Sequence, residues 1–134
     1  MEDKIKILKI IHFAIVLGVV FASVFAGEIY SLSNLSVPDF NTANLIYFAI
    51  PFLAVFLSNF LFRKSMQTIS STNTISKKMA IYQFASIIRW TIIEATIFLL
   101  IFGFPDFKVL GVLLILYLIL IRPTNQSVYS ELNI

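Results

Sequence analysis

Long runs of apolar residues, separated by short polar segments, constrain this sequence more than any other feature. A helix needs about 20 apolar residues to cross the roughly 30 Å hydrocarbon layer of a membrane. Four runs reach or approach that length, at about residues 5–27, 43–62, 79–103 and 109–122. We therefore predict an all-α polytopic membrane protein, in which residues 1–134 form a single domain of four transmembrane helices.

The fourth run is the shortest. An apolar stretch of about 13 residues covers only about 20 Å as a helix. It must extend past Arg122, whose long side chain can reach the interface, or lie where the bilayer thins. The polar residues 123–134 are predicted to form a cytoplasmic tail. Val128 and Leu132 could make that tail a short amphipathic helix, and a frayed tail is the equal alternative.

The composition agrees with a membrane protein and excludes most other classes. The chain is 59% hydrophobic and 13% charged, whereas soluble domains are usually about 45–50% apolar and about 25% charged. A chain this small cannot bury the excess, which argues against a soluble enzyme. It has no Cys and one His, so we expect no metal site and no cofactor. The net charge of +3 is too small to indicate a nucleic-acid partner.

Basic residues gather on one side of the predicted spans. That side carries Lys4, Lys6, Lys9, Arg63, Lys64, Lys77, Lys78 and Arg122. The other side carries Lys108 beside Glu28, Asp39 and Asp106. The positive-inside rule then predicts that both termini and the Ser/Thr-rich loop 65–78 are cytoplasmic. We expect a multi-pass protein of a bacterial inner (plasma) membrane, with its N-terminus in and its C-terminus in.

The four spans can be interpreted as two helical hairpins. Aligning His12 with Arg89 also brings Phe21 onto Phe98 and Phe25 onto Phe102. Such a match would make the hairpins parallel tandem repeats about an axis along the membrane normal. Apolar helices also align by chance, so a duplication and its absence remain equal alternatives.

Three ionisable residues lie within the apolar spans: His12, Arg89 and Glu94. If Gly103 marks the outer boundary of the third span, Glu94 falls near the midplane. Arg89 then falls about 7 Å inside the cytoplasmic boundary, with His12 at a similar depth. Ionisable side chains at such depth are costly and usually mark function. We predict an intramembrane polar cluster that serves as an ion pair, a proton site or a ligand site.

The geometry of this cluster leaves alternatives open. Arg89 and Glu94 are about 140° apart around one helix, so they would meet only through a neighbouring helix or subunit. An isolated Glu94 would favour its protonated form and could carry a proton, whereas one paired with Arg89 or His12 would stay ionised as a structural link. Candidates for supporting residues are Trp90, Thr91, Thr96 and Asn59. No arrangement typical of a catalytic site occurs, so we expect no catalytic residues and no enzyme.

Two resemblances involve these residues. The chain carries Ile88-Arg89-Trp90, Glu94-Ala95, Arg122-Pro123-Thr124 and a final Glu131-Leu132. Over nearly its whole length it resembles an uncharacterised family of small four-helix bacterial inner-membrane proteins, which implies a fold but no activity. Over about one helix, the segment 94–98 resembles the carboxylate-bearing helix of rotary ATPase c subunits and their proteolipid form. That resemblance implies a ring oligomer in which Glu94 carries a proton.

Three hypotheses for function follow. The first is a non-enzymatic integral membrane subunit or assembly factor, which contacts lipids and further copies or other subunits, with Arg89 and Glu94 as a buried polar link. The second is a proton-translocating, c-subunit-like component that uses Glu94 as the carrier. The third is lipid or quinone binding, with Arg89 meeting the polar headgroup.

Overall fold

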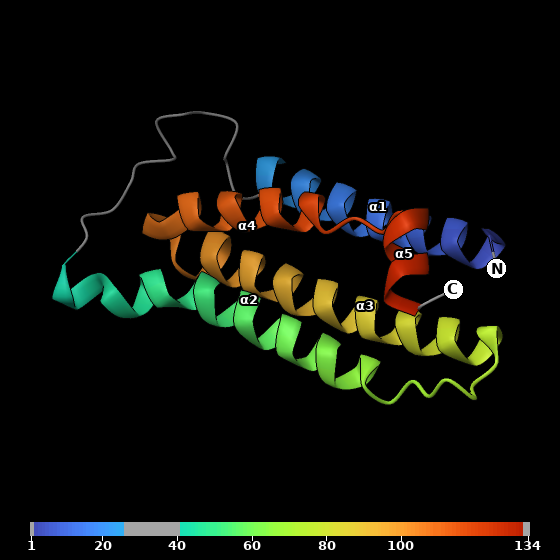
Figure 1. Cartoon of the computed structure of the whole chain (residues 1–134). Helices are drawn as coiled ribbons and strands as arrows, with labels where there is room; N and C mark the ends of the chain where they lie inside the picture. The colour runs from blue at the N-terminus through green and yellow to red at the C-terminus, as the bar shows by residue number, and fades with distance from the viewer. Residues whose placement is uncertain (1, 26–40, 133–134) are drawn as a thin grey trace.

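The structure, a computed structural model, describes residues 2–25 and 41–132 and is all-α in that part of the chain. The helices are α1 (Glu2–Phe25), α2 (Leu45–Met66), α3 (Ile75–Phe98), α4 (Lys108–Leu120) and α5 (Asn125–Leu132) (Figure 1). A π-helical turn, Leu99–Gly103, continues α3. The end of the first predicted span at Gly27 and the predicted outer loop with Glu28 and Asp39 lie outside the described residues.

Within the described residues, three helical stretches are long and apolar enough to cross a membrane. They are Asp3–Phe25, Thr42–Met66 and Ile75–Gly103, and they confirm three of the predicted spans. The predicted fourth span, 109–122, is shorter in the structure, because α4 has only 13 residues and ends at Leu120. It counts as a span only together with α5, from which it is bent by 76°. The protein is thus a multi-pass membrane protein with three candidate spans, or up to four.

The bend between α4 and α5 follows from the local sequence. Pro123 has no N–H to donate and disfavours a helical backbone at the residue before it. The helix resumes at Asn125, where Thr124 and Ser127 cap each other. The N–H of Thr124 donates to the hydroxyl of Ser127 at 3.0 Å, and the N–H of Ser127 donates to the hydroxyl of Thr124 at 3.1 Å. Such reciprocal capping stabilises a helix start.

Helix α3 is the centre of the bundle and packs against α1, α2, α4 and α5. Its inward face is fully buried at Met79, Ala85, Trp90, Ile93 and Ile97. The neighbours α3 and α4 form one of the two predicted hairpins. In the described residues, α1 and α2 pack mainly on α3 and α4 and make little contact with each other. The contacts within the two halves of the described chain therefore differ.

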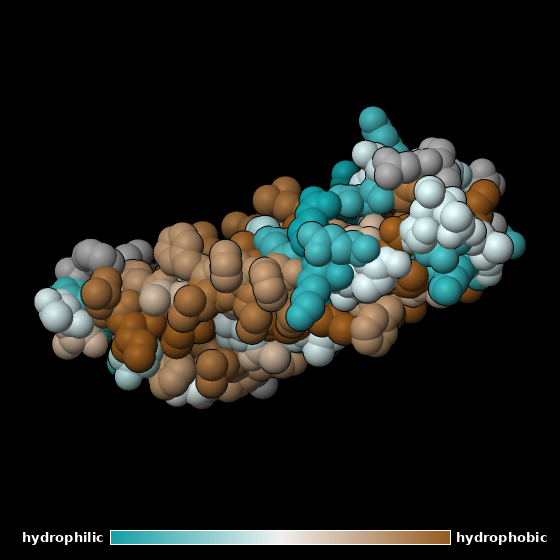
Figure 2. Space-filling model, turned by 60° about the horizontal axis from the view of Figure 1, so that its bottom comes forward, coloured by the Kyte–Doolittle hydropathy of each residue, from teal (hydrophilic) through white to brown (hydrophobic). Residues whose placement is uncertain are grey.

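The helices α1 to α4 run alternately up and down, so the N-terminus, the loop after α2 and α5 gather at one end of the bundle (Figure 1). We call it the basic end, because Lys4, Lys9, Arg63, Lys64 and Lys77 lie there. On the face shown in Figure 2, hydrophobic side chains cover much of the length, and hydrophilic residues gather mainly toward one end. Large apolar side chains are widely exposed, for example Phe52 at 77% and Phe56 at 71%. Such a surface suits contact with lipid.

The sequence left two alternatives for the tail, a short amphipathic helix or a frayed end. The structure shows the helix, α5. Helix α5 buries Val128 and Leu132 completely or nearly so and contacts α1 and α3. Its Glu131 accepts a hydrogen bond from Arg63 of α2 at 2.9 Å. Helix α5 thus lies across the basic end of the bundle instead of leaving it (Figure 1).

Candidate functional site

His12 joins α1 to the end of α4. Its side chain is buried, and its Nε2 lies 2.8 Å from the carbonyl oxygen of Leu118. A carbonyl can only accept, so Nε2 carries the proton and donates. Because α4 ends at Leu120 and the N–H of Arg122 bonds Ile119 instead, the carbonyl of Leu118 has no helical partner. His12 therefore satisfies a carbonyl that the early end of α4 would leave unpaired.

Trp90 packs against His12 in the interior. The two rings meet edge to face, with centroids 4.8 Å apart. Trp90 is fully buried. This contact connects α3 to the α1–α4 junction and gives Trp90 a packing role.

Arg89 packs against an aromatic ring of α2 rather than beside Glu94. Its guanidinium carbon is 4.0 Å from the centroid of the Phe62 ring, a cation–π contact. Glu131 of α5 forms its ion pair with Arg63 of α2. The pairing of Arg89 with Glu94, which the sequence left open, is not formed in the part of the chain that the structure describes.

Asn59 contributes to the same region through α4. Its Nδ2 donates to the hydroxyl of Tyr117 at 2.9 Å, which ties α2 to α4. The sequence named Asn59 as a candidate supporting residue, and the structure shows Tyr117 as its hydrogen-bond partner.

Some hydrogen-bonding capacity near Arg89 is unused. Among the described residues, Ser86 Oγ, Arg89 Nε and Trp90 Nε1 are buried without a hydrogen-bond partner. They lie within about one turn of α3. Buried polar groups are usually paired, so this turn differs from an ordinary packed core.

Glu94 lies apart from this cluster. It is partly exposed, and no described residue forms a hydrogen bond or an ion pair with it. Thr91 and Ala95, beside it on α3, are exposed. Thr96 donates to the carbonyl of Ile92 in its own helix at 2.8 Å. The structure therefore packs His12 against Trp90, Arg89 against Phe62 and Asn59 against Tyr117. It leaves Glu94 on the outer side of α3 with Thr91.

The sequence pointed neither to Phe62 as the ring beside Arg89, nor to Tyr117 as the partner of Asn59, nor to Glu131 as the partner of Arg63. Tyr117 carried a usable signal, because it is a polar hydroxyl within an otherwise apolar helix. Glu131 carried none, because the bend that returns α5 to the bundle depends on long-range packing. In the described part of the chain, no group of three His, Cys, Asp or Glu side chains could hold a metal ion.

No protein-family description, curated protein or solved structure matches this chain. Neither resemblance suggested by the sequence therefore gains support from a detected relative. The structure shows a helical protein with three to four candidate membrane spans.

Proposed function

We propose that this protein is a non-enzymatic integral membrane subunit or assembly factor that binds another membrane chain through the outer face of α3. The observation that carries the proposal is Glu94, a partly exposed carboxyl in a membrane-spanning helix without a partner among the described residues. At about 1.5 Å per residue, Glu94 lies about 13 Å along the helix from Gly103. That depth is close to the middle of the hydrocarbon layer.

An unpartnered carboxyl at that depth favours association. Ionisable side chains within a membrane are costly and face protein or water rather than lipid. Since α1 and α2 pack on α3 but make little contact with each other, part of α3 stays uncovered. A polar group on a neighbouring chain would satisfy Glu94 there.

The residues around Glu94 suit the approach of a helix. On the uncovered face of α3, the side chains of Thr91 and Ala95 next to Glu94 are small. The side chains of Phe84 and Leu99, farther along this face, are large. Small residues let helix backbones come close in a membrane, and polar side chains then hydrogen-bond across the contact. Arg89 meanwhile contributes an internal link, through Phe62 of α2.

The test compares complexes extracted from native membranes without detergent. We expect Glu94→Leu to lower the mass of the complex that contains this chain, and Glu94→Gln to do so partially because the amide keeps hydrogen-bonding capacity. The matched control is Thr96→Val, since its hydroxyl bonds its own helix and should leave the complex intact. A wild-type chain that is extracted as a lone monomer would contradict the proposal.

The same observation favours one alternative, proton carriage by Glu94. A carboxyl on the membrane-facing side of a helix, with no internal cation beside it, could load and release a proton. If so, Glu94→Gln in proteoliposomes would abolish proton flux while the complex stays assembled. A carbodiimide, which reacts with protonated carboxyl groups, would then label Glu94 and stop the flux. If Glu94→Gln leaves the proton flux unchanged but dissociates the complex, the subunit proposal is supported and Glu94 is not a proton carrier.

A further inference from the structure

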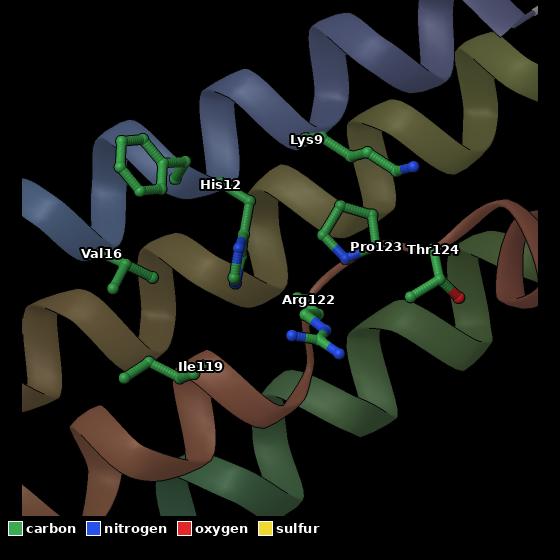
Figure 3. Close-up of a pocket in the computed structure, with 8 residues that line it drawn as sticks. Lys9, His12, Val16, Ile119, Arg122, Pro123 and Thr124 are labelled. Carbon is green, nitrogen blue, oxygen red and sulfur yellow. The ribbon is translucent and has the colours of Figure 1, made fainter.

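A groove of about 630 Å³ opens at the basic end of the bundle, beside His12. One side is α1, through Lys9, Phe13 and Val16. The other is the end of α4 and its connection to α5, from Ile119 to Thr124 (Figure 3). It does not include Arg89 or Glu94.

The short α4 creates this groove. Its 13 residues cover about 20 Å, about 10 Å less than the hydrocarbon layer. The chain then bends by 76° into α5. The space that a full-length fourth helix would occupy beside α1 is thus partly open, and it lies where the hydrocarbon layer meets the basic end.

The groove carries positive charge that the described residues do not neutralise. Lys9 Nζ donates one hydrogen bond, to Asn125 Oδ1 at 3.0 Å, and keeps two further N–H groups. The guanidinium of Arg122 has no hydrogen bond or ion pair with the described residues, and no acidic side chain lines the groove. Figure 3 shows the side chains of Lys9, Arg122 and Thr124 around the same opening.

The remaining surface of the groove is apolar and fits hydrocarbon. Phe13 is 66% exposed, although it lies deeper in the membrane than Lys9. Val16 and Ile119 continue this wall away from the charged end. His12 is also part of the wall, and its Nε2–H is taken up by the carbonyl of Leu118.

We propose that this groove binds an anionic phospholipid, with its phosphate between Lys9 and Arg122 and its acyl chains along Phe13, Val16 and Ile119. Basic pockets between membrane helices recognise anionic headgroups in this way. The hydroxyl of Thr124 adds a donor, because it accepts from Ser127 and its own hydrogen stays available. The adjoining apolar wall favours a lipid over a free anion.

The test measures lipid retention by native mass spectrometry of the purified full chain with phosphatidylglycerol or phosphatidylcholine. We expect the wild type to retain phosphatidylglycerol selectively, and less at higher salt. Each basic side chain near a membrane surface contributes a factor of about five. Lys9→Gln combined with Arg122→Gln should therefore weaken phosphatidylglycerol binding about 25-fold.

Two control variants distinguish loss of the groove's basic residues from loss of overall charge and from misfolding. Lys6→Gln combined with Lys64→Gln removes the same charge from exposed residues at the same end and should change binding less than about fivefold. Lys9→Arg combined with Arg122→Lys keeps the charge and should retain the lipid, which shows that a loss in the first variant is not misfolding.

Three outcomes would overturn the proposal. One is equal retention of the two lipids by the wild type. Another is an equal loss of binding in the groove variant and in the Lys6/Lys64 variant. The third is complete displacement of phosphatidylglycerol by millimolar inorganic phosphate, which would make the groove a site for a free anion.

Discussion

Arg89 contacts a neighbouring helix through an aromatic ring rather than through an acidic side chain. Its guanidinium carbon lies 4.0 Å from the centroid of the Phe62 ring on α2. A desolvated cation–π contact is worth about 2 kcal/mol. Arg89 therefore ties α3 to α2, and none of the described residues forms an ion pair with it.

His12 should stabilise the fold through its hydrogen bond to Leu118. We expect His12→Leu to lower the free energy of unfolding by about 1–3 kcal/mol, because a buried carbonyl loses its donor. His12→Gln can still donate and should recover part of the loss. Unfolding by denaturing detergent in mixed micelles gives these values. The neighbouring Phe13→Leu, on an exposed side chain, serves as the control, and a His12→Leu protein as stable as wild type would refute the assignment.

At the scale of the helices, α3 and α4 approach closely at Gly111. A Cβ built there would lie 2.7 Å from Cγ1 of Ile101, in the π-helical turn that ends α3. The same construction at Gly18 of α1 meets nothing within 4 Å. The sequence contains both glycines within apolar helices and does not distinguish them.

We expect Gly111→Ala to destabilise the protein by about 1–3 kcal/mol, because an added methyl group overpacks a tight contact. Gly18→Ala should be neutral or stabilising, since alanine favours a helix more than glycine does. Detergent-induced unfolding of the two variants compares them directly. Equal effects of the two substitutions would contradict the close approach of α3 and α4.

Helix α5 should be held by burial and only weakly by its ion pair. Val128 is fully buried, whereas the Arg63–Glu131 pair is 65% exposed on the arginine side and 27% on the glutamate side. Burying a valine contributes about 1.5–3 kcal/mol, and an exposed ion pair about 0–1 kcal/mol. We expect Val128→Ser to speed hydrogen exchange of the amides in 125–132 at least about tenfold, and Glu131→Gln to have a smaller effect. The reverse order would show that the ion pair docks α5.

The sequence predicted some of these elements and not others, for physical reasons. Apolar runs report a helix and its membrane depth, so α1, α2 and α3 were predictable from hydropathy alone. The end of α4 was partly predictable from Pro123. The packing of α5 on α3 was not predictable. It depends on the buried contacts of Val128 and Leu132 with distant helices, and the local sequence pattern does not specify which helix they contact. The partners of Arg89 were missed for the same reason.

At the scale of the whole molecule, the helices share one interior, but the bundle does not cover the whole surface of its central helix. Helix α3 packs on all four other helices, yet one of its faces stays uncovered around Glu94. Both described ends of the chain lie at the basic end (Figure 1). The positive-inside rule predicts that this end is cytoplasmic. The polar groups that bear on function in the described residues are thus the interior around Arg89, the basic end and the Glu94 carboxyl on the outer face of α3.

Site-specific photo-crosslinking in native membranes tests whether the Glu94 face of α3 contacts another protein chain. The crosslinker replaces Ala95, an exposed residue beside Glu94, and in the control it replaces Leu113, which is 55% exposed on α4. We expect a crosslinked protein product of defined mass from position 95, which Glu94→Leu abolishes, and lipid adducts alone from position 113. Lipid adducts alone from both positions would show that the Glu94 face of α3 contacts lipid and no protein partner.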